Sequence, residues 1–436
     1  MKFKKTLTSA MALLLISSVV AGCSTGDKPK ESSNSSAPTQ STSTGPVKLR
    51  ILWWGSQARH DATQKALELY TKKNSNVTFE KEYSTWDGYW DKLAVQYTAN
   101  NAPDIIQMDA TYLNDYSTRN LLADLSSVST EDIDKGLIDT GKVNGKLYGF
   151  PISTTSFGMV YDKVALEKFG IQAPKDGWTW DDFFKFAKEA KAKIGNDKYV
   201  FVDENIQAFY QYAAYQYGQG KGFPITEAGK FNYDKASFLD WGNKLAELRK
   251  IGALPPAEKV ASDVGLDPNQ DMIIKGTALM GTLNSGQFSS LDSLKPNTFA
   301  MVTMPKGTAP SGWLKASMYW SVNAQSKNVE EAKKFVDWFM HDSEAAIILG
   351  KTRGLPASKK LVDQLKPNFS AADKAIQDAI DKTAQYAQVY KPDPKGWSNF
   401  GQKEYKSIYE KLMYGQITPE QAFDELTKKG KEYENK

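Results

Sequence analysis

The chain has 436 residues, of which 41% are hydrophobic, 12% aromatic and 24% charged, with a formal net charge of +4. Three of these charges belong to Lys2, Lys4 and Lys5, so the chain beyond them is nearly neutral at +1. A net charge this close to zero does not indicate nucleic acid or a strongly acidic surface as a binding partner. The length from residue 46 onward exceeds one ordinary domain and predicts two lobes.

A basic start is followed by an apolar stretch from Met11 to Val20, which is too short to span a bilayer and is typical of a secretory signal. It ends at Val20-Ala21-Gly22-Cys23, which resembles the bacterial lipobox, in which the cysteine is acylated and becomes the first mature residue. Cys23 is the only cysteine in the sequence and cannot form an internal disulfide. We expect a signal peptide at 1–22 and a lipid such as palmitate on Cys23. The alternative is a cysteine that follows an ordinary signal peptide.

Residues 23–45 are rich in Ser, Thr, Lys and Pro, and no apolar residue follows Ala37 in this stretch. Such a composition cannot bury enough surface to offset the entropy of ordering, so we expect a flexible tether. No long apolar run appears after Val47. The predicted location is therefore the extracellular face of the cell membrane, with the lipid as the only contact to the membrane.

The first folded segments alternate between strand and helix. Residues 48–54, 77–83 and 104–108 are predicted strands, with helices at 58–73 and 87–99 between them. This alternation is typical of a parallel sheet covered by helices. Further along, Asn144-Gly145 predicts a hairpin turn, and Thr179 is a predicted N-cap for a helix that begins at Trp180.

The later segments are read in the same way. Extended segments are predicted at 156–161, 199–202, 278–280, 299–304 and 318–322, and helices at 329–340, 343–349, 371–388, 405–414 and 419–428. We expect an α/β fold with two lobes, a hinge and a cleft between the lobes. The first lobe is predicted from 46–157 with about 305–345, the second from 158–304 with about 346–436, and the crossings near 155–161, 304–316 and 341–352.

Polar and aromatic side chains cluster after the predicted strands, where open parallel sheets bind ligands. Carboxylates and amides pair with sugar hydroxyl groups, and flat aromatic rings pack against the C–H faces of a sugar. The sequence predicts one ligand site from these loops, and the family resemblance described below implies that its ligand is an oligosaccharide. Its predicted members are Ser56, Gln57, Arg59, Asp61, Trp86, Asp87, Asp109, Asn284, Ser285, Gln287, Trp320 and Arg353.

Several of these residues also have a purely structural interpretation, and Arg59 could be a solvated side chain. Asp61 is equally suited to a first helical turn, Asp87 and Asp109 to N-caps, and Trp86 to a core. Tyr319 and Trp320 alternate on one strand, so at most one of them is expected to face a cleft. Four further aromatic residues are more weakly indicated and are expected in the core: Phe157, Trp178, Tyr210 and Tyr212.

The chain resembles the extracellular solute-binding proteins of family 1, the sugar receptors of ABC importers. The resemblance runs over nearly the whole mature chain and rests on the order of five motifs: Ala102-Pro103-Asp104-Ile105, Asn144 to Pro151, Gly276 to Met280, Met304-Pro305-Lys306-Gly307 and Arg353-Gly354-Leu355-Pro356. It implies a two-lobed, monomeric receptor that closes over an oligosaccharide and is recognised by the membrane subunits of an importer. It implies no cofactor and no metal, and it places a sugar-binding carboxylate at Asp109.

A looser resemblance concerns the ligand. Trp53 to Asp61, together with Trp86 to Trp90, is similar to receptors for pectin-derived oligosaccharides such as rhamnogalacturonan fragments. Arg59 and Arg353 are two of only five arginines, and both fall in predicted cleft loops. An arginine fork binds a carboxylate in a bidentate manner, which favours a ligand that contains a uronic acid. Neutral hydroxyl groups are the alternative partners.

Catalysis has little support in the sequence. A glycosidase needs paired carboxylates, which Asp61, Asp87 and Asp109 could imitate. The only histidines are His60 and His341, and no phosphate-binding glycine loop or serine nucleophile elbow is present. We expect a receptor without catalytic residues. The alternatives are a surface adhesin for polysaccharide and a lipid-anchored glycoside hydrolase or lyase.

Overall fold

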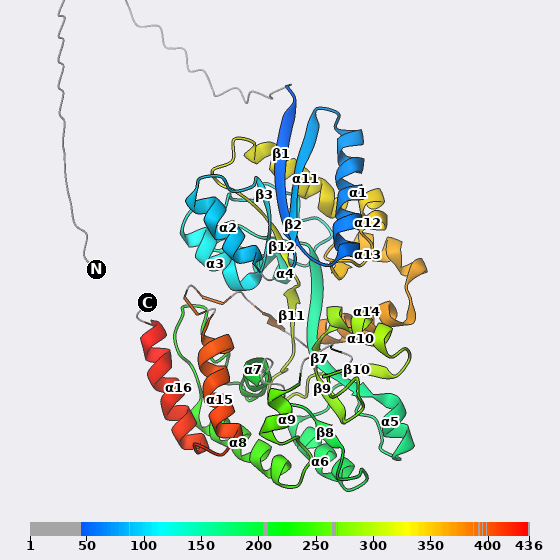
Figure 1. Cartoon of the computed structure of the whole chain (residues 1–436), viewed down its shortest axis with the longest axis vertical. Helices are drawn as coiled ribbons and strands as arrows, with labels where there is room; N and C mark the ends of the chain where they lie inside the picture. Colours follow the sequence, from blue (N-terminus) through cyan, green and yellow to red (C-terminus); the bar gives the residue numbers. More distant parts are fainter. Residues whose placement is uncertain are drawn as a thin grey trace, which may run out of the picture. The chain divides into compact units, whose positions relative to one another are not determined.

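Two mixed sheets, one in each lobe, organise the folded residues of the computed structural model (Figure 1). The structure describes residues 45–434 except 87, 204–207, 264–266, 268, 387, 391–392, 395 and 398. The predicted signal peptide, Cys23 and nearly all of the predicted tether lie outside the described residues, and so does Asp87. No helix of the described part is both long and apolar enough to cross a membrane.

The sheet of the first lobe contains, among the described residues, five strands in the order β2-β1-β3-β12-β6. Strands β1 (Val47–Trp54), β2 (Val77–Ser84) and β3 (Ile105–Met108) are parallel, whereas β12 (Tyr319–Val322) and β6 (Phe150–Pro151) run antiparallel to their neighbours. Helices cover this sheet: α1 (Gln57–Lys73), α2 (Tyr89–Thr98), α3 (Ala110–Thr118), α4 (Lys135–Asp139), α11 (Val329–His341) and α12 (Ser343–Leu349). The predicted parallel core of strand and helix is confirmed.

The sheet of the second lobe has the order β14-β11-β7-β9-β8 within the described part, with β10 and β13 also paired to β7. Its strands are β7 (Ser153–Asp162), β8 (Tyr199–Phe201), β9 (Ala278–Asn284), β10 (Phe299–Thr303), β11 (Trp313–Ala316), β13 (Leu355–Pro356) and β14 (Gln388–Val389). The surrounding helices are α5 (Lys163–Lys168), α6 (Trp180–Lys191), α7 (Ala208–Gly218), α8 (Lys235–Lys250), α9 (Ala257–Ala261), α10 (Phe288–Leu294), α13 (Lys359–Leu365), α14 (Ala371–Ala384), α15 (Lys406–Met413) and α16 (Pro419–Glu434).

Local sequence signals explain several boundaries. Thr179 caps α6 and forms a reciprocal capping box with Asp182, as the sequence predicts for the cap. Asn144 and Gly145 have φ values of 51° and 81°, which is the left-handed conformation that a two-residue hairpin between β4 (Lys142–Val143) and β5 (Lys146–Leu147) requires. Helix α14 ends at Ala384, earlier than the predicted 388, because β14 pairs with β11 there.

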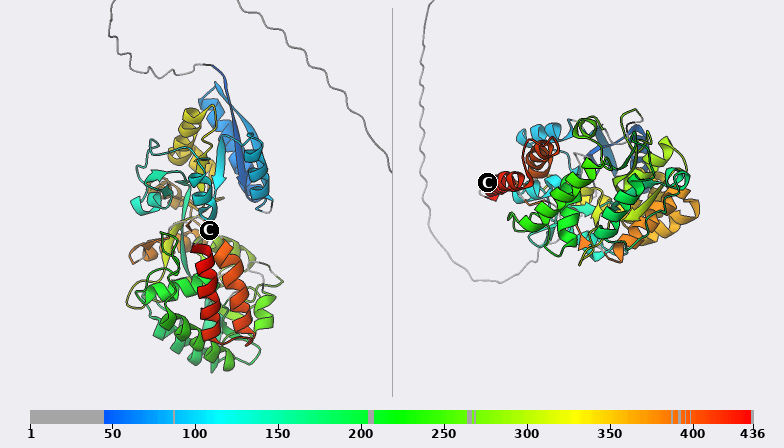
Figure 2. Two further views of the ribbon diagram at one scale, coloured as in Figure 1. Left: turned by 90° about the vertical axis from the view of Figure 1, so that its left-hand side faces the viewer. Right: turned by 90° about the horizontal axis from the view of Figure 1, so that it is seen from below.

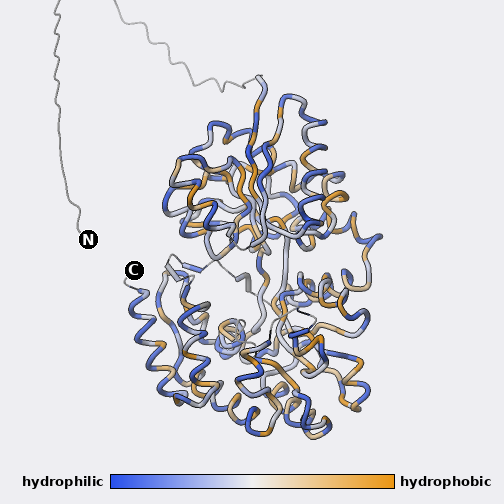
Figure 3. The backbone as a smooth tube through the Cα atoms, in the orientation of Figure 1, coloured by the Kyte–Doolittle hydropathy of each residue, from blue (hydrophilic) through white to orange (hydrophobic). Residues whose placement is uncertain are grey.

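Separate hydrophobic cores define the lobes. One core joins β1 and β3 to Trp320, Phe335 and Leu349, and the others join β7 and β9 to Trp313 and Leu314. Residues from Ala316 to Leu349 thus contribute to the core of the first lobe, although they follow much of the second lobe in the chain. Hydrophobic and hydrophilic segments alternate along the helices (Figure 3), as expected for helices that cover a sheet on one side.

Three segments connect the lobes. Strand β7 begins beside β13 and β11 and continues beside β9 and β10. The second connection runs from β11 into β12, and the third from α12 into β13. The left view of Figure 2 shows the two groups of elements joined by this narrow set of segments. Several connections of this kind are typical of hinge closure.

Candidate functional site

A polar cavity of about 810 Å³ lies where the two lobes meet the hinge. Ser56 and Arg59 of the first lobe line it, and Asn284 and Gln287 line it from the second lobe. The hinge contributes Thr155, Lys315, Ser317 and the segment 351–355, and serine residues of α10 add further hydroxyl groups. We refer to this space as the interlobe cavity. It brings together five of the predicted site residues: Ser56, Arg59, Asn284, Gln287 and Arg353.

The loop after β1 places Arg59 at the cavity. Ser56 is the exposed N-cap position of α1, and Gly55 is half-buried before it. The Nε of Arg59 donates to the carbonyl oxygen of Thr352 at 2.7 Å, and its Nη1 donates to that of Trp54 at 3.1 Å. Burial lowers the pKa of Arg59 to about 10, so the side chain stays protonated at neutral pH. Arg59 therefore joins the first lobe to the third hinge segment.

Gln57 and Asp61, predicted in the same loop, are exposed and do not line the cavity. The amide of Gln57 donates to the Asp61 carboxylate at 2.7 Å, one turn along α1. This pair agrees with the interpretation of Asp61 as a structural residue in the first turns of the helix.

Arg353 lies on the inner wall of the cavity, with a side chain only 5% exposed. Its Nε donates to Oε1 of Gln107 at 3.1 Å and its Nη2 to Oγ1 of Thr63 at 2.9 Å, while its Nη1 has no hydrogen-bond partner among the described residues. The guanidinium carbon lies 5.4 Å from the ring centroid of Trp320. Burial, and then the charge of Arg59, lower the pKa of Arg353 well below its usual value. No carboxylate of the described part forms an ion pair with either arginine.

The loop after β9 is fixed to the hinge by Ser285. This side chain is fully buried; its Oγ lies 3.1 Å from Oγ1 of Thr155 and accepts from the backbone N–H of Ser156 at 3.0 Å. Asn284 and Gln287 form a reciprocal cap around it and reach the cavity. Ser285 was predicted to bind ligand, but the structure places it behind the site, where it holds the two amides in position.

Lys315 is a cavity residue that the sequence did not indicate. It lies on β11 opposite Thr155 of β7, and both side chains line the cavity. The structure gives its ammonium no hydrogen bond or ion pair within the described residues, whereas the neighbouring Lys351 is paired with Asp373. Only the tertiary pairing of β7 with β11 makes Lys315 part of the site, so no local pattern could have found it.

Asp109 belongs to a second group of polar residues, which is not part of the cavity lining. Its carboxylate accepts from the N–H of Thr111 at 2.9 Å as the N-cap of α3, so the predicted N-cap role is present. Asn114 is on α3, and its side-chain amide donates to the backbone carbonyl oxygen of Asp393 at 2.6 Å. Burial, and then the charge of Asp109, raise the pKa of Asp393, while Lys315 opposes this shift. We call the carboxylates of Asp109 and Asp393 the Asp109–Asp393 edge.

Two tyrosines support this edge. The Tyr390 hydroxyl donates to the Asp393 carboxylate at 2.6 Å, and its ring centroid lies 6.1 Å from that of Tyr210 on α7. Burial raises the pKa of Tyr210, and Asp393 and Asp109 raise it further. Tyr210 packs against the core of the second lobe, as expected. Neither Asp393 nor Tyr390 was predicted. Their close spacing in the sequence was the one signal that could have indicated them as a pair.

Trp86 belongs to an aromatic cluster at the ends of β1 and β2. It is 44% exposed, and its ring centroid lies 5.1 Å from that of Trp54 and 5.6 Å from that of Trp90. Trp90 in turn stacks on Tyr112 at 3.8 Å. Neighbouring rings thus hold Trp86 in place while one side stays open, which is the arrangement needed to receive the C–H face of a sugar.

Trp320 lies away from the cavity, in the core of the first lobe. It is fully buried beside Phe339, with ring centroids 5.3 Å apart. Tyr319 is also buried, and its hydroxyl pairs with Oγ1 of Thr140 at 3.0 Å. Neither face of β12 opens to a ligand, because helices and loops cover both. The weaker candidates Phe157, Trp178 and Tyr212 are buried as well, as expected.

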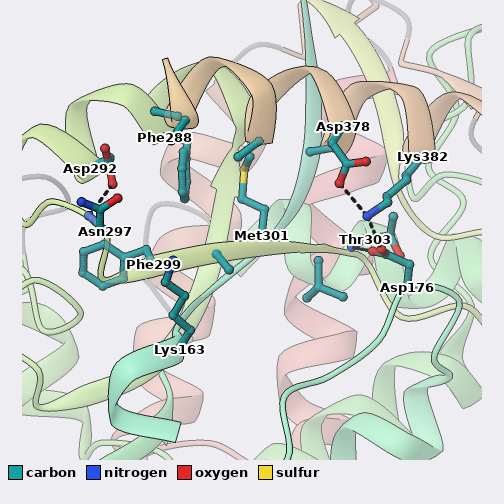
Figure 4. A pocket seen from close by; sticks show the side chains of 16 residues that line it. Lys163, Asp176, Phe288, Asp292, Asn297, Phe299, Met301, Thr303, Asp378 and Lys382 are labelled. Carbon is teal, nitrogen blue, oxygen red and sulfur yellow. Dashed lines mark hydrogen bonds and ion pairs between the residues drawn. The ribbon is translucent and has the colours of Figure 1, made fainter. Parts of the chain in front are cut away.

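A smaller cavity of about 210 Å³ lies within the second lobe, between β10 and α14 (Figure 4). Its charged side chains are largely paired, since Lys382 contacts Asp176 at 2.9 Å and Asp378 at 2.5 Å. Phe288, Phe299 and Met301 form its apolar wall. It contains none of the predicted site residues, and we take the interlobe cavity as the candidate site.

Comparison with known proteins identifies the family. A model of the bacterial extracellular solute-binding proteins matches residues 65–378. The chain belongs to this family. It is 26% identical over 241 residues to an ABC transporter extracellular-binding protein of Pyrococcus horikoshii, spanning 55% of this chain and about half (51%) of that protein. It is also 24% identical over 374 residues to the maltooligosaccharide ABC transporter solute-binding lipoprotein of Streptococcus pneumoniae, covering 80% of this chain and 79% of the relative.

Solved structures confirm the fold. A periplasmic oligogalacturonide-binding protein of Yersinia enterocolitica, solved with saturated digalacturonic acid, superposes with a TM-score of 0.73 at 23% identity, over 89% of this chain and 98% of the other. The two-lobed α/β fold predicted from the sequence is therefore correct, and so is the predicted membership of the extracellular solute-binding proteins.

The pKa of His60 generates a prediction on stability. Its Nδ1 accepts from the indole N–H of Trp53 at 3.0 Å, and burial, followed by the charges of Arg59 and Arg353, lowers the pKa of His60 below 6.5. Below that pH the unfolded chain takes up a proton that the folded chain resists, so stability falls as the pH falls, by at most about 1.4 kcal/mol per pH unit. In His60→Gln, the loss of unfolding free energy between pH 7.5 and 5.5 should be smaller than in the wild type.

Urea denaturation at the two pH values measures this difference. His341→Gln serves as the control, because His341 is the one other histidine in the sequence. If His60→Gln and the wild type lose the same unfolding free energy between the two pH values, the loss does not come from His60.

Proposed function

We propose that this protein is the substrate receptor of a carbohydrate ABC importer, held at the outer face of the cell membrane by a lipid on Cys23. The observation that carries the proposal is the interlobe cavity, which is lined by hydroxyl, amide and cationic groups from both lobes of a solute-binding protein. A ligand closes two lobes only when it contacts both better in the closed state. An elongated oligosaccharide between Ser56 and Asn284 satisfies this condition.

The residues around the cavity supply the contacts that a sugar needs. Asn284 and Gln287 line the cavity and offer both donors and acceptors. Asp109 and Trp86, which are outside its lining, would extend the site with an acceptor and an exposed aromatic ring. We propose that the protein binds sugar without altering it and passes it to the membrane subunits of the importer. The names of the pneumococcal relative and of the Yersinia structure, a maltooligosaccharide and an oligogalacturonide binder, support a carbohydrate ligand.

We further propose that the ligand contains a uronic acid. Arg59 and Arg353 line the same cavity and lack carboxylate partners in the described part of the chain. Lys315 adds a third cationic group, which has no hydrogen-bond or ion-pair partner in the described part of the chain. A carboxylate on the ligand would neutralise charge that the protein leaves uncompensated.

The first prediction concerns ligand binding. A panel of neutral and acidic oligosaccharides is screened by thermal shift and then by calorimetry; a ligand at 100 times its Kd adds about 2.7 kcal/mol to stability. The variants Arg59→Gln, Asp109→Ala and Trp86→Ala should each weaken binding by about 1–3 kcal/mol, because the first two leave a polar group of the ligand unpaired and the third removes an aromatic contact. The exposed Arg119→Gln and Tyr414→Ala are matched controls. Native affinity in all three variants would place the site elsewhere, and formation of shorter products would indicate an enzyme.

A second prediction uses salt. A partly exposed contact between Arg59 and a carboxylate weakens as ionic strength rises. The affinity for a galacturonate-containing oligosaccharide should therefore fall between 50 and 500 mM salt, while that for a neutral oligosaccharide of equal length stays nearly constant. Equal salt dependence for both ligands would count against the uronic acid.

A third prediction concerns the anchor. Replacing Cys23 with Ala removes the thiol that the lipobox-like motif offers for acylation, so the full-length protein should move from the membrane fraction to the medium. Immunoblots of the two fractions measure the shift, with Ser24→Ala as control. Unchanged partitioning of Cys23→Ala would exclude lipidation at this residue.

A further inference from the structure

Gln287 lines the interlobe cavity from the second lobe. It is half-buried and is the last residue of the short 3-10 helix η1 (Ser285–Gln287), which follows β9. Its Oε1 accepts from the backbone N–H of Asn284 at 3.3 Å and from the side-chain amide of Asn284 at 3.5 Å. Because an amide oxygen has two lone pairs, both acceptor positions of Gln287 are used within the cap.

The first of these partners fixes the orientation of the amide. A backbone N–H can only donate, so the atom of Gln287 that faces it is the oxygen and not the nitrogen. The Nε2 is therefore the part of the amide that is left for a ligand, and no hydrogen bond joins it to the described part of the chain. Asn284 supplies the acceptor of the pair, whereas Gln287 offers the cavity N–H donors alone.

Arg59 offers donors from the first lobe. Two of its N–H groups donate to the carbonyl oxygens of Thr352 and Trp54. A guanidinium group has five N–H donors, and the remaining ones have no acceptor among the residues that the structure describes. The serine hydroxyl groups of the cavity can donate or accept, so they suit either kind of ligand group. Donors that cannot change their role thus line the cavity from both lobes.

The acidic side chains of the cavity wall do not bind these donors. Asp373 is fully buried and paired with Lys351. Asp292 lines both this cavity and the smaller one, and its carboxylate accepts from the backbone N–H of Asn297 at 3.0 Å (Figure 4). Within the described residues, neither carboxylate is bonded to the free donors of the two lobes. A ligand oxygen that accepts without donating is therefore the group that these donors lack.

We propose that Gln287 determines the specificity of the receptor for an acidic sugar, by donating from its Nε2 to the carboxylate of a uronate bound in the interlobe cavity. The inference rests on the oligosaccharide function proposed above. A hydroxyl group of a neutral sugar also accepts a hydrogen bond, but its own proton then needs an acceptor that Gln287 does not provide. A carboxylate has only lone pairs to offer, and hydrogen bonds to a charged group are the stronger ones. The fixed amide thus selects the carboxylate.

The variant Gln287→Glu removes the donors and keeps the cap, because a glutamate at this position accepts from the Asn284 N–H as the glutamine does. Calorimetry with trigalacturonate and galactotriose gives the affinity ratio of an acidic to a neutral sugar. The wild type should favour trigalacturonate about tenfold, and in Gln287→Glu this ratio should fall about tenfold or more. Gln172→Glu changes the charge equally at an exposed residue outside the cavity and should leave the ratio unchanged.

A neutral variant separates the hydrogen bond from the added charge. Gln287→Met has a side chain of similar length with no N–H group and no charge. Its ratio should also fall about tenfold, because a hydrogen bond to a charged acceptor is worth more than one to a neutral hydroxyl group. Thermal denaturation confirms that each variant is folded before its affinities are compared. If Gln287→Met keeps the wild-type ratio while Gln287→Glu loses it, the added charge acts at a distance and the proposed hydrogen bond is absent.

The outcomes separate this inference from the function on which it rests. If both variants keep the wild-type ratio, Gln287 does not determine specificity and the receptor function stands. If the wild type binds galactotriose as tightly as trigalacturonate, or binds only other oligosaccharides, the selection of a carboxylate is wrong and the receptor function again stands. If no oligosaccharide of a broad panel binds, the receptor function is wrong and this inference is wrong with it.

Discussion

The backbone pairing of β7 determines where every part of the candidate site lies. Along ten residues this strand pairs with β13 and β11 near its start and with β9 and β10 further on. All three connections between the lobes are thereby drawn to one place. Thr155 lies opposite Lys315, and the neighbouring Thr154 lies opposite Leu355, only two residues after Arg353. Segments some 160 and 200 positions after β7 in the chain meet at this strand, because β7 pairs along both of its edges.

The third connection adds a charge to this arrangement. Arg353 extends from the hinge into the first lobe, where Gln107, Thr63 and the ring of Trp320 receive it. A buried guanidinium without an acidic partner is costly, and burial alone depresses its pKa. The protein tolerates it because two polar acceptors and an aromatic face satisfy most of the group. Its Nη1 has no partner among the described residues, and the same residue lines the cavity, which connects the stability of the first lobe with the chemistry of the site.

Much of the fold follows from local patterns, but only part of the site does. The apolar run of β1, the Asn144-Gly145 turn and the Thr179 cap are decided within a few residues, and all three agree with the structure. Arg59 and Asn284 were also predictable, because they follow strands whose ends face the cavity. Trp320 was not, since alternation shows which face a residue takes but not that Phe339 and other side chains cover it. Lys315 and Asp393 depend on pairing between distant segments, which periodicity does not contain.

The hydroxyl of Ser285 has a consequence for the kinetics of binding. It ties the loop of Asn284 and Gln287 to the hinge strand through Thr155 and Ser156, while these two amides hold each other through the cap. The entropy of ordering this loop is therefore lost during folding and not at the moment when a ligand arrives. Binding to such a preorganised loop requires no search among loop conformations, so the slow step left to the protein is the movement of the lobes themselves.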